Sequence, residues 1–267
     1  QRDKSALIRK KLLYLEGGKI YLKRTWDYEA AAVNYLADIL SNNVTRGVDL
    51  PEPLTCGDVT LSSQQRKAIA TALSSRLSMI LGGAGSGKTT LIRAMVKAAP
   101  FPRYTVVAAA PTGKAARNLT ERTGIQARTI HSALGKVPDE NFLDPVYWEY
   151  VHLVIIDEAS MVSLEMLAGI LNRVSKDCRV VLLGDPNQLL AVGAGNVLSD
   201  LRELEIPVTY LEQQYRQSES AEALRYNVVE FPKLHDVSEL HWDGSFRLIP
   251  ASDMEIAKIV CHEASKR

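Results

Sequence analysis

The sequence has few cysteines, few aromatic residues and no long apolar run, and each of these shortages excludes a class of protein. Its three cysteines, Cys56, Cys178 and Cys261, lie far apart and lack the paired spacing of a metal site or a disulfide framework. We therefore expect reduced thiols, as in a cytoplasmic protein. No apolar run reaches about 18 residues, and no basic segment leads into an apolar one, so we expect neither a membrane span nor a signal peptide.

The length of 267 residues allows one large domain or two small ones, with enough apolar side chains for a core. Internal repeats are absent. Because the chain begins at Gln1 rather than at methionine, we expect it to be a piece of a longer protein.

The net charge of +1 conceals a strong asymmetry along the chain. Residues 61–135 contain eleven Lys and Arg residues and a single acidic residue, Glu121, for a net charge of +10. Residues 1–24 add a net charge of +6. A basic block of this size suggests a track for a polyanion. Basic residues scattered over solvated helix faces would have the same composition, so charge alone leaves both interpretations open.

The most informative segment is residues 82–89, with the sequence GGAGSGKT. It fits the phosphate-binding pattern G-x-x-x-x-G-K-[ST], in which glycines let backbone N–H groups converge on a triphosphate. Lys88 would contact the β- and γ-phosphates, and Thr89 would bind Mg²⁺. A predicted strand precedes the segment and a predicted helix follows it, which favours an anion at the helix N-terminus. The candidate nucleotide-binding residues here are Gly83, Ala84, Gly85, Ser86, Gly87, Lys88, Thr89 and Thr90.

A second motif places two carboxylates at the end of an apolar strand. Asp157 and Glu158 follow four aliphatic residues, an unusual position for a solvated acidic pair. At the tip of a neighbouring parallel strand, Asp157 would hold Mg²⁺ against the phosphates. Glu158 would orient and deprotonate the attacking water.

Two other segments are candidates for the same site. Residues 184–189, GDPNQL, follow a predicted strand on the same sheet edge, where Gln188 would contact the γ-phosphate. An ordinary Asp-Pro-Asn turn is the alternative. Ser62 and Gln65 have the spacing of a helix capping box. Gln65 could equally hydrogen-bond adenine, and the residue type does not separate these roles.

Polar residues at further strand ends are candidates for contacts with DNA. The segment AAPTGKAAR at 109–117 spans the end of a predicted strand and the start of a predicted helix. Thr112 and Lys114 would hold a DNA phosphate there. Thr129 and His131 form a second cluster, although a lone histidine is more often structural. Arg216 would be an arginine finger or an ordinary surface arginine. We expect the DNA motifs to lie away from Lys88.

The coarse pattern from residue 61 onward alternates strands with helices. Such alternation predicts an α/β fold with a parallel sheet covered by helices on both faces. The predicted strands are 77–81, 104–110, 151–156, 179–183, 208–211 and 245–249. The predicted helices are 63–74, 88–99, 113–123, 163–174, 195–204, 218–230 and 252–265. Before residue 61 we expect a strand at 19–22, a helix at 28–40 and a linker at 41–60, and we expect a small insertion at 136–150.

Taken in order, these motifs resemble superfamily 1 helicases, and most closely the RecD family, the α subunit of the exonuclease V (RecBCD) complex. The resemblance covers about residues 15–217. The segments that carry it are YLKRTWDYE at 21–29, GGAGSGKTT at 82–90, APTGKAARNLTE at 110–121, TIHSALG at 129–135, DEASMVS at 157–163, LGDPNQL at 183–189 and YRQ at 215–217.

The resemblance implies an ATP- and Mg²⁺-dependent 5′→3′ DNA helicase that moves on single-stranded DNA in double-strand break repair and recombination. Gln65 would contact adenine, Lys88, Asp157 and Glu158 would act in catalysis, and Gln188 and Arg216 would sense the γ-phosphate. The residues that would line the DNA path are Pro111, Thr112, Lys114, Thr129 and His131.

The resemblance also implies a domain plan and partners. Residues 1–60 would be the remnant of a preceding domain, and residues 61–250 a RecA-like P-loop NTPase domain. Residues 251–267 would lead to a second RecA-like domain that the sequence lacks. RecB- and RecC-like subunits would be the partners, with no membrane. A conjugative relaxase-type helicase and a non-catalytic scaffold subunit that binds nucleotide and DNA are the alternatives. In the family, Pro and Thr usually stand at the positions of Ala84 and Ser86.

Overall fold

The computed structural model describes residues 12–43, 47–83, 85–136, 145–188 and 191–211. These residues all belong to the first of two compact units into which the chain divides, residues 1–215 and 216–267. Ala84, Arg216 and Cys261 lie outside the described residues, as do the helices and the strand predicted beyond residue 211. No helix within the described ranges is long and apolar enough to cross a membrane.

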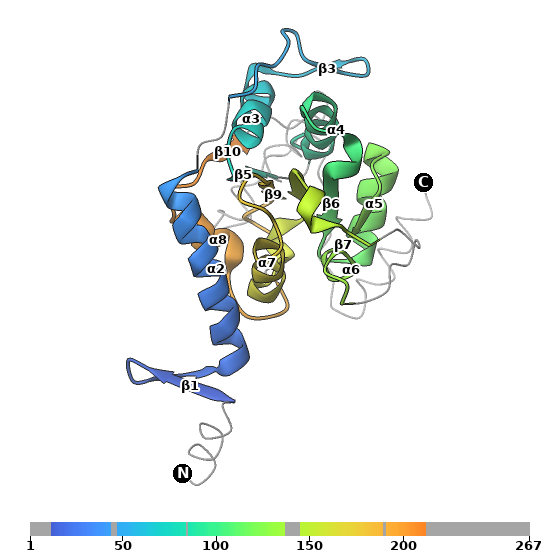
Figure 1. The fold of residues 1–267 in the computed structure, drawn as a ribbon. Coiled ribbons are helices and arrows are strands. Elements are labelled where there is room, and N and C mark those ends of the chain that lie inside the picture. The colour runs from blue at the N-terminus through green and yellow to red at the C-terminus, as the bar shows by residue number, and fades with distance from the viewer. Residues whose placement is uncertain (1–11, 44–46, 84, 137–144, 189–190, 212–267) are drawn as a thin grey trace, which may run out of the picture. The chain divides into compact units, whose positions relative to one another are not determined.

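Six parallel strands form one sheet in the centre of the described structure (Figure 1). In spatial order they are β10 (Val208–Leu211), β5 (Leu77–Gly82), β9 (Arg179–Gly184), β8 (Leu153–Ile156), β6 (Val106–Ala110) and β7 (Ala127–Thr129). Every neighbouring pair is parallel. The central strands β5 and β8 are buried along their whole length, as expected for a sheet covered on both faces.

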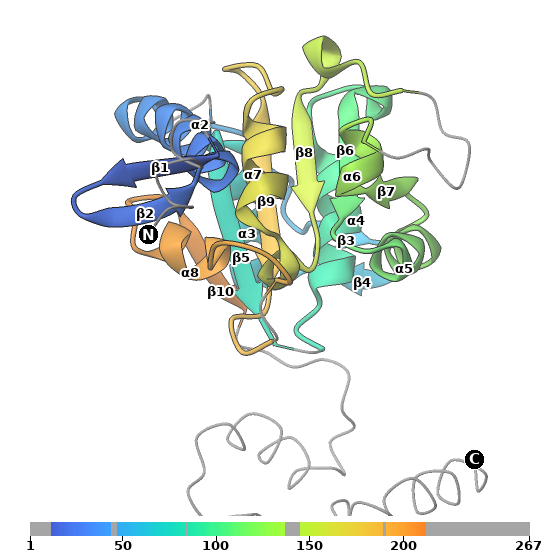
Figure 2. The ribbon, with the colours of Figure 1, turned by 90° about the horizontal axis from the view of Figure 1, so that it is seen from below.

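Helices cover both faces of this sheet, which confirms the predicted α/β class (Figures 1 and 2). On β5, Leu77 and Met79 belong to the core on the side of α2 (Lys23–Ser41), α7 (Leu164–Leu171) and α8 (Val197–Arg202). The next residue, Ile80, belongs to the core on the side of α3 (Ser63–Leu73), α4 (Lys88–Ala98) and α5 (Gly113–Thr123). Because successive side chains of a strand point to opposite faces of the sheet, β5 contributes apolar side chains to both cores.

The predicted helix and strand limits agree best where a capping residue marks them. Thr112 accepts a hydrogen bond from the backbone of Ala115 at the start of α5, and Gly124 ends the helix in the left-handed conformation, so the predicted span 113–123 is correct. The predicted helices at 163–174 and 195–204 are shorter, as α7 and α8. The predicted strand 104–110 begins with a 3-10 turn at Arg103–Thr105.

The segment predicted as a linker contains a small hairpin of its own. Strands β3 (Thr55–Cys56) and β4 (Val59–Thr60) pair antiparallel, and Leu54 and Cys56 are buried in the core beside α4. Strand β7 and the short helix α6 (Ile130–Ala133) were also not predicted. Their four or fewer residues are too few for a periodic pattern to appear in the sequence.

The first described residues form a hairpin that leads directly into a long helix. Strands β1 (Leu13–Glu16) and β2 (Lys19–Leu22) pair antiparallel, and α2 begins at Lys23, five residues before the predicted start. The extra turn lacks apolar periodicity. Side-chain pairs one turn apart hold it: Lys23 pairs with Asp27, and Arg24 donates to Tyr28.

Helix α2 is tied to the elements around it by Glu165, at the start of α7. Arg24 Nη2 and Lys136 Nζ each lie 2.6 Å from a different carboxylate oxygen of Glu165. The hydrogen bond from Lys136, and to a smaller extent the one from Arg24, lowers the pKa of Glu165 from an ordinary value of 4.5 to about 2. The carboxylate thus joins three segments that are distant in the sequence.

We expect Glu165→Gln to lower the thermal midpoint at pH 7 by roughly 2–4 °C. A folded-state pKa below the unfolded value means that the stabilisation is present above about pH 4.5 and is lost as the pH falls toward 2. Unfolding measured by circular dichroism between pH 3 and pH 7 should show the difference shrinking with falling pH. The control is Glu203→Gln, at an exposed position after α8. An equal destabilisation at every pH would contradict this assignment.

Candidate nucleotide-binding site

The phosphate loop connects the end of β5 to the start of α4 and requires glycine at several positions. Gly85 and Gly87 adopt φ angles of 83° and 86°, which side-chain-bearing residues rarely adopt. A Cβ on Gly82 would lie 2.6 Å from Ser86 Oγ. The buried Ser86 Oγ has no hydrogen-bond partner among the described residues. The loop is therefore compact, with an unused hydroxyl in its interior.

Lys88, the first residue of α4, folds back over this loop. Its Nζ donates to the carbonyl oxygens of Gly82 and Gly83, the latter at 2.9 Å. Neutral carbonyl groups are weaker partners for an ammonium group than phosphate oxygens are. The lysine is therefore positioned at the loop in a contact that an anion can replace, and Thr89 and Thr90 follow it on the first turn.

Asp157 and Glu158 follow the buried strand β8. The Asp157 carboxylate accepts a hydrogen bond of 2.9 Å from the backbone N–H of Glu158. Burial raises the pKa of Asp157, and the Glu158 charge adds to the rise, while that hydrogen bond and the charges of Lys88 and Arg122 oppose it. Glu158 has a φ of 54° and is the one non-glycine residue with positive φ in the described part of the chain. Such strain is maintained where it orients a functional side chain.

The strand order corrects one detail of the sequence interpretation. We predicted that the carboxylate strand lies next to the strand of the phosphate loop, but β9 lies between β5 and β8. The residues after β9 therefore stand between the loop and the acidic pair. Asp185 is buried there and accepts from the backbone N–H of Asn187 at 3.0 Å, which fixes the turn. Gln188 accepts a hydrogen bond of 3.4 Å from Ser160 Oγ.

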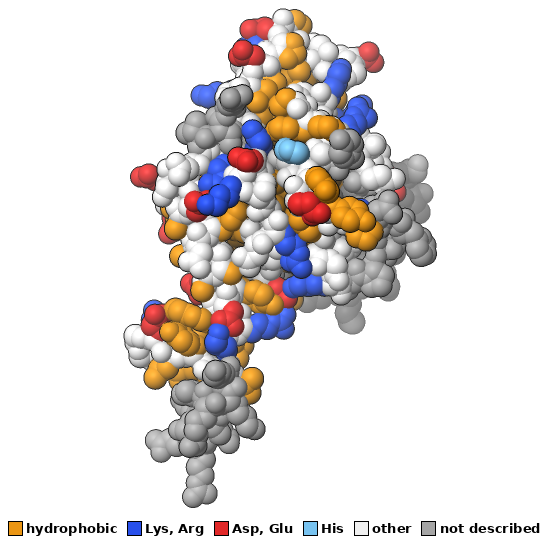
Figure 3. Space-filling model, in the orientation of Figure 1, with side chains coloured by type: hydrophobic (Ala, Val, Ile, Leu, Met, Phe, Trp, Pro, Cys, Tyr) orange, Lys and Arg blue, Asp and Glu red, His pale blue; other side chains and the backbone are white. Residues whose placement is uncertain are grey.

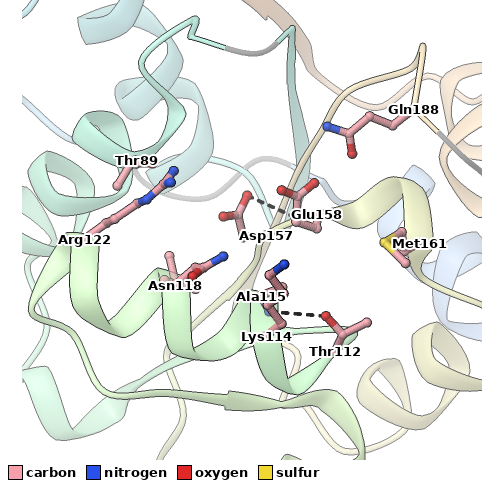
Figure 4. Close-up of a pocket in the computed structure, with 11 residues that line it drawn as sticks. Thr89, Thr112, Lys114, Ala115, Asn118, Arg122, Asp157, Glu158, Met161 and Gln188 are labelled. Carbon is pink, nitrogen blue, oxygen red and sulfur yellow. Dashed lines mark hydrogen bonds between the residues drawn. The ribbon is translucent and has the colours of Figure 1, made fainter. Parts of the chain in front are cut away.

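These segments meet at a pocket of about 260 Å³ (Figure 4). The predicted residues Thr89, Asp157, Glu158 and Gln188 all line it, although they come from three different strand ends. The residues lining this pocket are Thr89, Thr112, Lys114, Ala115, Asn118, Leu119, Arg122, Asp157, Glu158, Met161 and Gln188. Within the described ranges, no three His, Cys, Asp or Glu residues gather as a metal site of protein ligands alone.

Sequence reasoning missed Asn118, Arg122 and Met161. A signal for the first two was present, because they lie four and eight residues after Lys114 on a predicted helix and so share its face. The segment that contains Thr112 was expected to lie away from Lys88. Thr112 and Lys114 line the same pocket as Thr89, the residue after Lys88, and their role in DNA binding stays a prediction.

Gln65 completes a capping box at the start of α3. Its backbone N–H donates to Ser62 Oγ at 3.2 Å, and its side-chain oxygen accepts from the Ser62 backbone at 3.1 Å. The capping prediction is confirmed. Gln65 does not line the pocket of Figure 4, and a contact with adenine stays a prediction.

The second predicted DNA cluster is placed by β7 and α6. Thr129 ends β7 and caps α6 by accepting from the backbone N–H of Ser132 at 3.1 Å, and His131 lies on that helix. Pro111 is buried directly after β6. On the face shown in Figure 3, Lys and Arg side chains are interspersed with Asp and Glu. The basic residues therefore do not form one continuous patch on this face.

A comparison with protein families shows whether these motifs occur together by chance or belong to a known family. An AAA domain family matches residues 60–231, which include the phosphate loop, the acidic pair and Gln188. The chain belongs to this AAA domain family. Nucleotide binding is a property that the family implies, and the matched range includes every predicted nucleotide-binding residue.

Individual relatives of this AAA domain include RecD subunits, a RecD2 DNA helicase and a conjugal transfer protein. The RecBCD enzyme subunit RecD of Mycolicibacterium smegmatis is 35% identical over 221 residues, covering 72% of this chain and 39% of the relative. The ATP-dependent RecD2 DNA helicase of Deinococcus radiodurans is 34% identical over 209 residues, covering 75% and 28%. The conjugal transfer protein TraA of Rhizobium radiobacter is 36% identical over 189 residues, covering 67% and 16%. The predicted resemblance to the RecD family is confirmed.

This AAA domain spans less than half the length of these curated relatives. Among solved structures, the Pif1 helicase from Candida albicans is 26% identical with a TM-score of 0.47 and covers 63% of this chain and 44% of that one.

Proposed function

We propose that this chain is the first RecA-like motor domain of an ATP-dependent 5′→3′ DNA helicase of the RecD type. The observation that carries the proposal is the convergence of Thr89, Asp157, Glu158 and Gln188 on one pocket beside the phosphate loop. A protein that used nucleotide only as structural ligand would need neither a strained glutamate beside that pocket nor a glutamine across from it. The scaffold alternative is therefore disfavoured.

The site fits a magnesium-bound nucleoside triphosphate. The loop has a buried Ser86 hydroxyl without a partner among the described residues and no room for a Cβ at Gly82. The Thr89 hydroxyl and the Asp157 carboxylate are oxygen ligands, which Mg²⁺ prefers. When bound, the ion would neutralise charge on the phosphates.

Each of the other groups has a separate task in hydrolysis. Lys88 would exchange the loop carbonyls for the β- and γ-phosphates. Glu158 would hold the attacking water and accept its proton. Gln188 would contact the γ-phosphate. When that phosphate is released, Gln188 would move, and its hydrogen bond with Ser160 would transmit the movement to the segment after Glu158. Arg216 would complete the γ-phosphate contacts, and Gln65 would contact adenine.

Single-stranded DNA would lie across the carboxyl ends of the strands. The proposed contacts are Pro111 and Thr112 after β6 and Thr129 and His131 after β7. Lys114 would serve the DNA or the nucleotide, since it lies in the shared pocket. From the similarity to RecD subunits of the RecBCD enzyme we further propose RecB- and RecC-like subunits as partners, and with them double-strand break repair and recombination as the process and a cytoplasmic location.

A relaxase-type helicase is the second candidate, and the similarity to TraA favours retaining it. The discriminating feature is the sequence that precedes residue 1 in the natural gene. A relaxase would have a histidine-rich metal site and a nucleophilic tyrosine there, and a RecD-type helicase would not.

The DNA part of the proposal predicts weak, strongly salt-dependent binding of single-stranded oligonucleotides, because phosphate contacts release counterions. Fluorescence anisotropy of a labelled oligonucleotide between 50 and 300 mM salt (about 10- to 1,000-fold loss across such a range) is the measurement. His131→Ala should weaken this binding and leave ADP binding unchanged, since His131 lies outside the nucleotide pocket. Thr112→Ala should weaken both, because Thr112 lines that pocket. An affinity independent of salt would contradict the DNA track.

A further inference from the structure

Helix α5 presents a stripe of polar side chains to the nucleotide pocket. Lys114, Asn118 and Arg122 are spaced by four residues and therefore lie on one face of the helix. In Figure 4, Arg122 extends from the last turn of α5 toward Thr89, while Asn118 lies beside Asp157 and Lys114 beneath Glu158. One wall of the pocket is thus a single rigid helix that faces the acidic pair.

Arg122 differs in its contacts from three other arginines of the described structure. Arg24, Arg66 and Arg76 each pair with a carboxylate. Arg122 is exposed and makes no hydrogen bond or ion pair with any other residue in the described part of the chain. Its guanidinium group therefore brings a permanent charge and five N–H donors to the rim of the pocket, with no hydrogen-bond acceptor among the described residues.

The Arg122 charge is placed where it could bind a phosphate chain, and it contributes no ion pair to the fold among the described residues. The phosphates are expected between Lys88 and Thr89, and Arg122 points to the Thr89 end of the pocket. Two neighbouring carboxylates would repel a triphosphate, and a cation on the opposite wall would offset that repulsion. A guanidinium group matches phosphate oxygens with two parallel hydrogen bonds.

We propose that Arg122 is a phosphate-binding residue that contacts the nucleotide from α5. This inference rests on the proposed nucleotide site and adds a residue to it. Because Thr112 caps the other end of the same helix, the phosphate contact and the DNA candidate lie at opposite ends of α5, about 15 Å apart. Nucleotide bound through Arg122 would therefore restrain the helix that carries the DNA contact.

The test compares ADP binding by the 267-residue chain and its variants in the presence of Mg²⁺. A fluorescent ADP analogue gives the dissociation constant, and thermal unfolding with and without ADP gives ligand-dependent stabilisation. We expect Arg122→Ala to raise Kd by roughly 10- to 100-fold. The thermal midpoint without ADP should not change, and Arg122→Lys should recover part of the affinity. The matched control is Arg93→Ala, an exposed arginine on α4 outside the pocket.

The outcomes separate this inference from the proposed function. If the wild-type chain binds no ADP, the proposed nucleotide site fails. If the wild type binds ADP and Lys88→Ala abolishes binding, but Arg122→Ala binds as the wild type does, the inference about Arg122 alone is overturned. An Arg122→Ala variant that loses oligonucleotide affinity and keeps its ADP affinity would also overturn it, because the arginine would then serve DNA.

Discussion

Lys88→Ala is expected to raise the dissociation constant for Mg²⁺-bound ADP and ATP by about 100-fold or more. The ammonium group donates to the carbonyl oxygens of Gly82 and Gly83 and sits where β- and γ-phosphates would replace them. Removal of this cation leaves phosphate charge without its nearest counter-charge. Binding of a fluorescent ADP analogue to the 267-residue chain, followed by isothermal titration with ATP, measures the loss.

Lys97→Ala is the matched control, because it removes a lysine from the exposed face at the other end of α4. It should bind nucleotide as the wild type does. Equal losses in the two variants would indicate a general effect of charge on the protein. Unchanged binding by Lys88→Ala would remove the phosphate loop from the proposed function.

Glu158→Gln is expected to keep ATP binding and to reduce hydrolysis by roughly 10²- to 10⁴-fold. The amide keeps the size of the carboxylate but cannot accept the proton of the attacking water. The left-handed backbone at Glu158, with φ of 54°, holds the side chain at the pocket and should do the same for glutamine. Phosphate release with saturating single-stranded DNA, measured on a gene product of the length of the RecD-type relatives, gives the rate.

The longer protein is used because hydrolysis in the proposed RecD-type helicase would need groups from a second domain, and the present chain spans 39% of the RecD subunit to which it is similar. We expect residues 1–267 to bind nucleotide and to turn it over poorly. The control is Glu149→Gln, at an exposed position before β8. Wild-type turnover by Glu158→Gln would show that another group accepts the proton.

Local sequence was sufficient wherever a few adjacent residues determine a structure. The glycines of the phosphate loop, the capping box at Ser62 and Gln65, and the limits Thr112 and Gly124 of α5 depend on contacts within about four residues. The same holds for the apolar run before Asp157, which predicted both a buried strand and its acidic end.

Short elements and weakly patterned ones could not be predicted in this way. Strand β7 and helix α6 have three and four residues, which is too short for periodicity. The first turn of α2 lacks apolar periodicity, and its helix formation follows from pairs such as Lys23 with Asp27 and from the contact of Arg24 with Glu165. The predicted start of that helix was therefore five residues late.

The sequence by itself determined the class of the fold, the phosphate loop and the acidic pair, because hydrophobic alternation and turn chemistry are short-range properties. Only the tertiary structure decided that β9 separates β5 from β8, that Thr112 shares a pocket with Thr89, and that Arg122 joins them. Strand order is fixed by pairing between segments as distant in the sequence as Leu77 and Val180, or Met79 and Val208. Such pairing depends on how whole faces pack, and no local pattern encodes it.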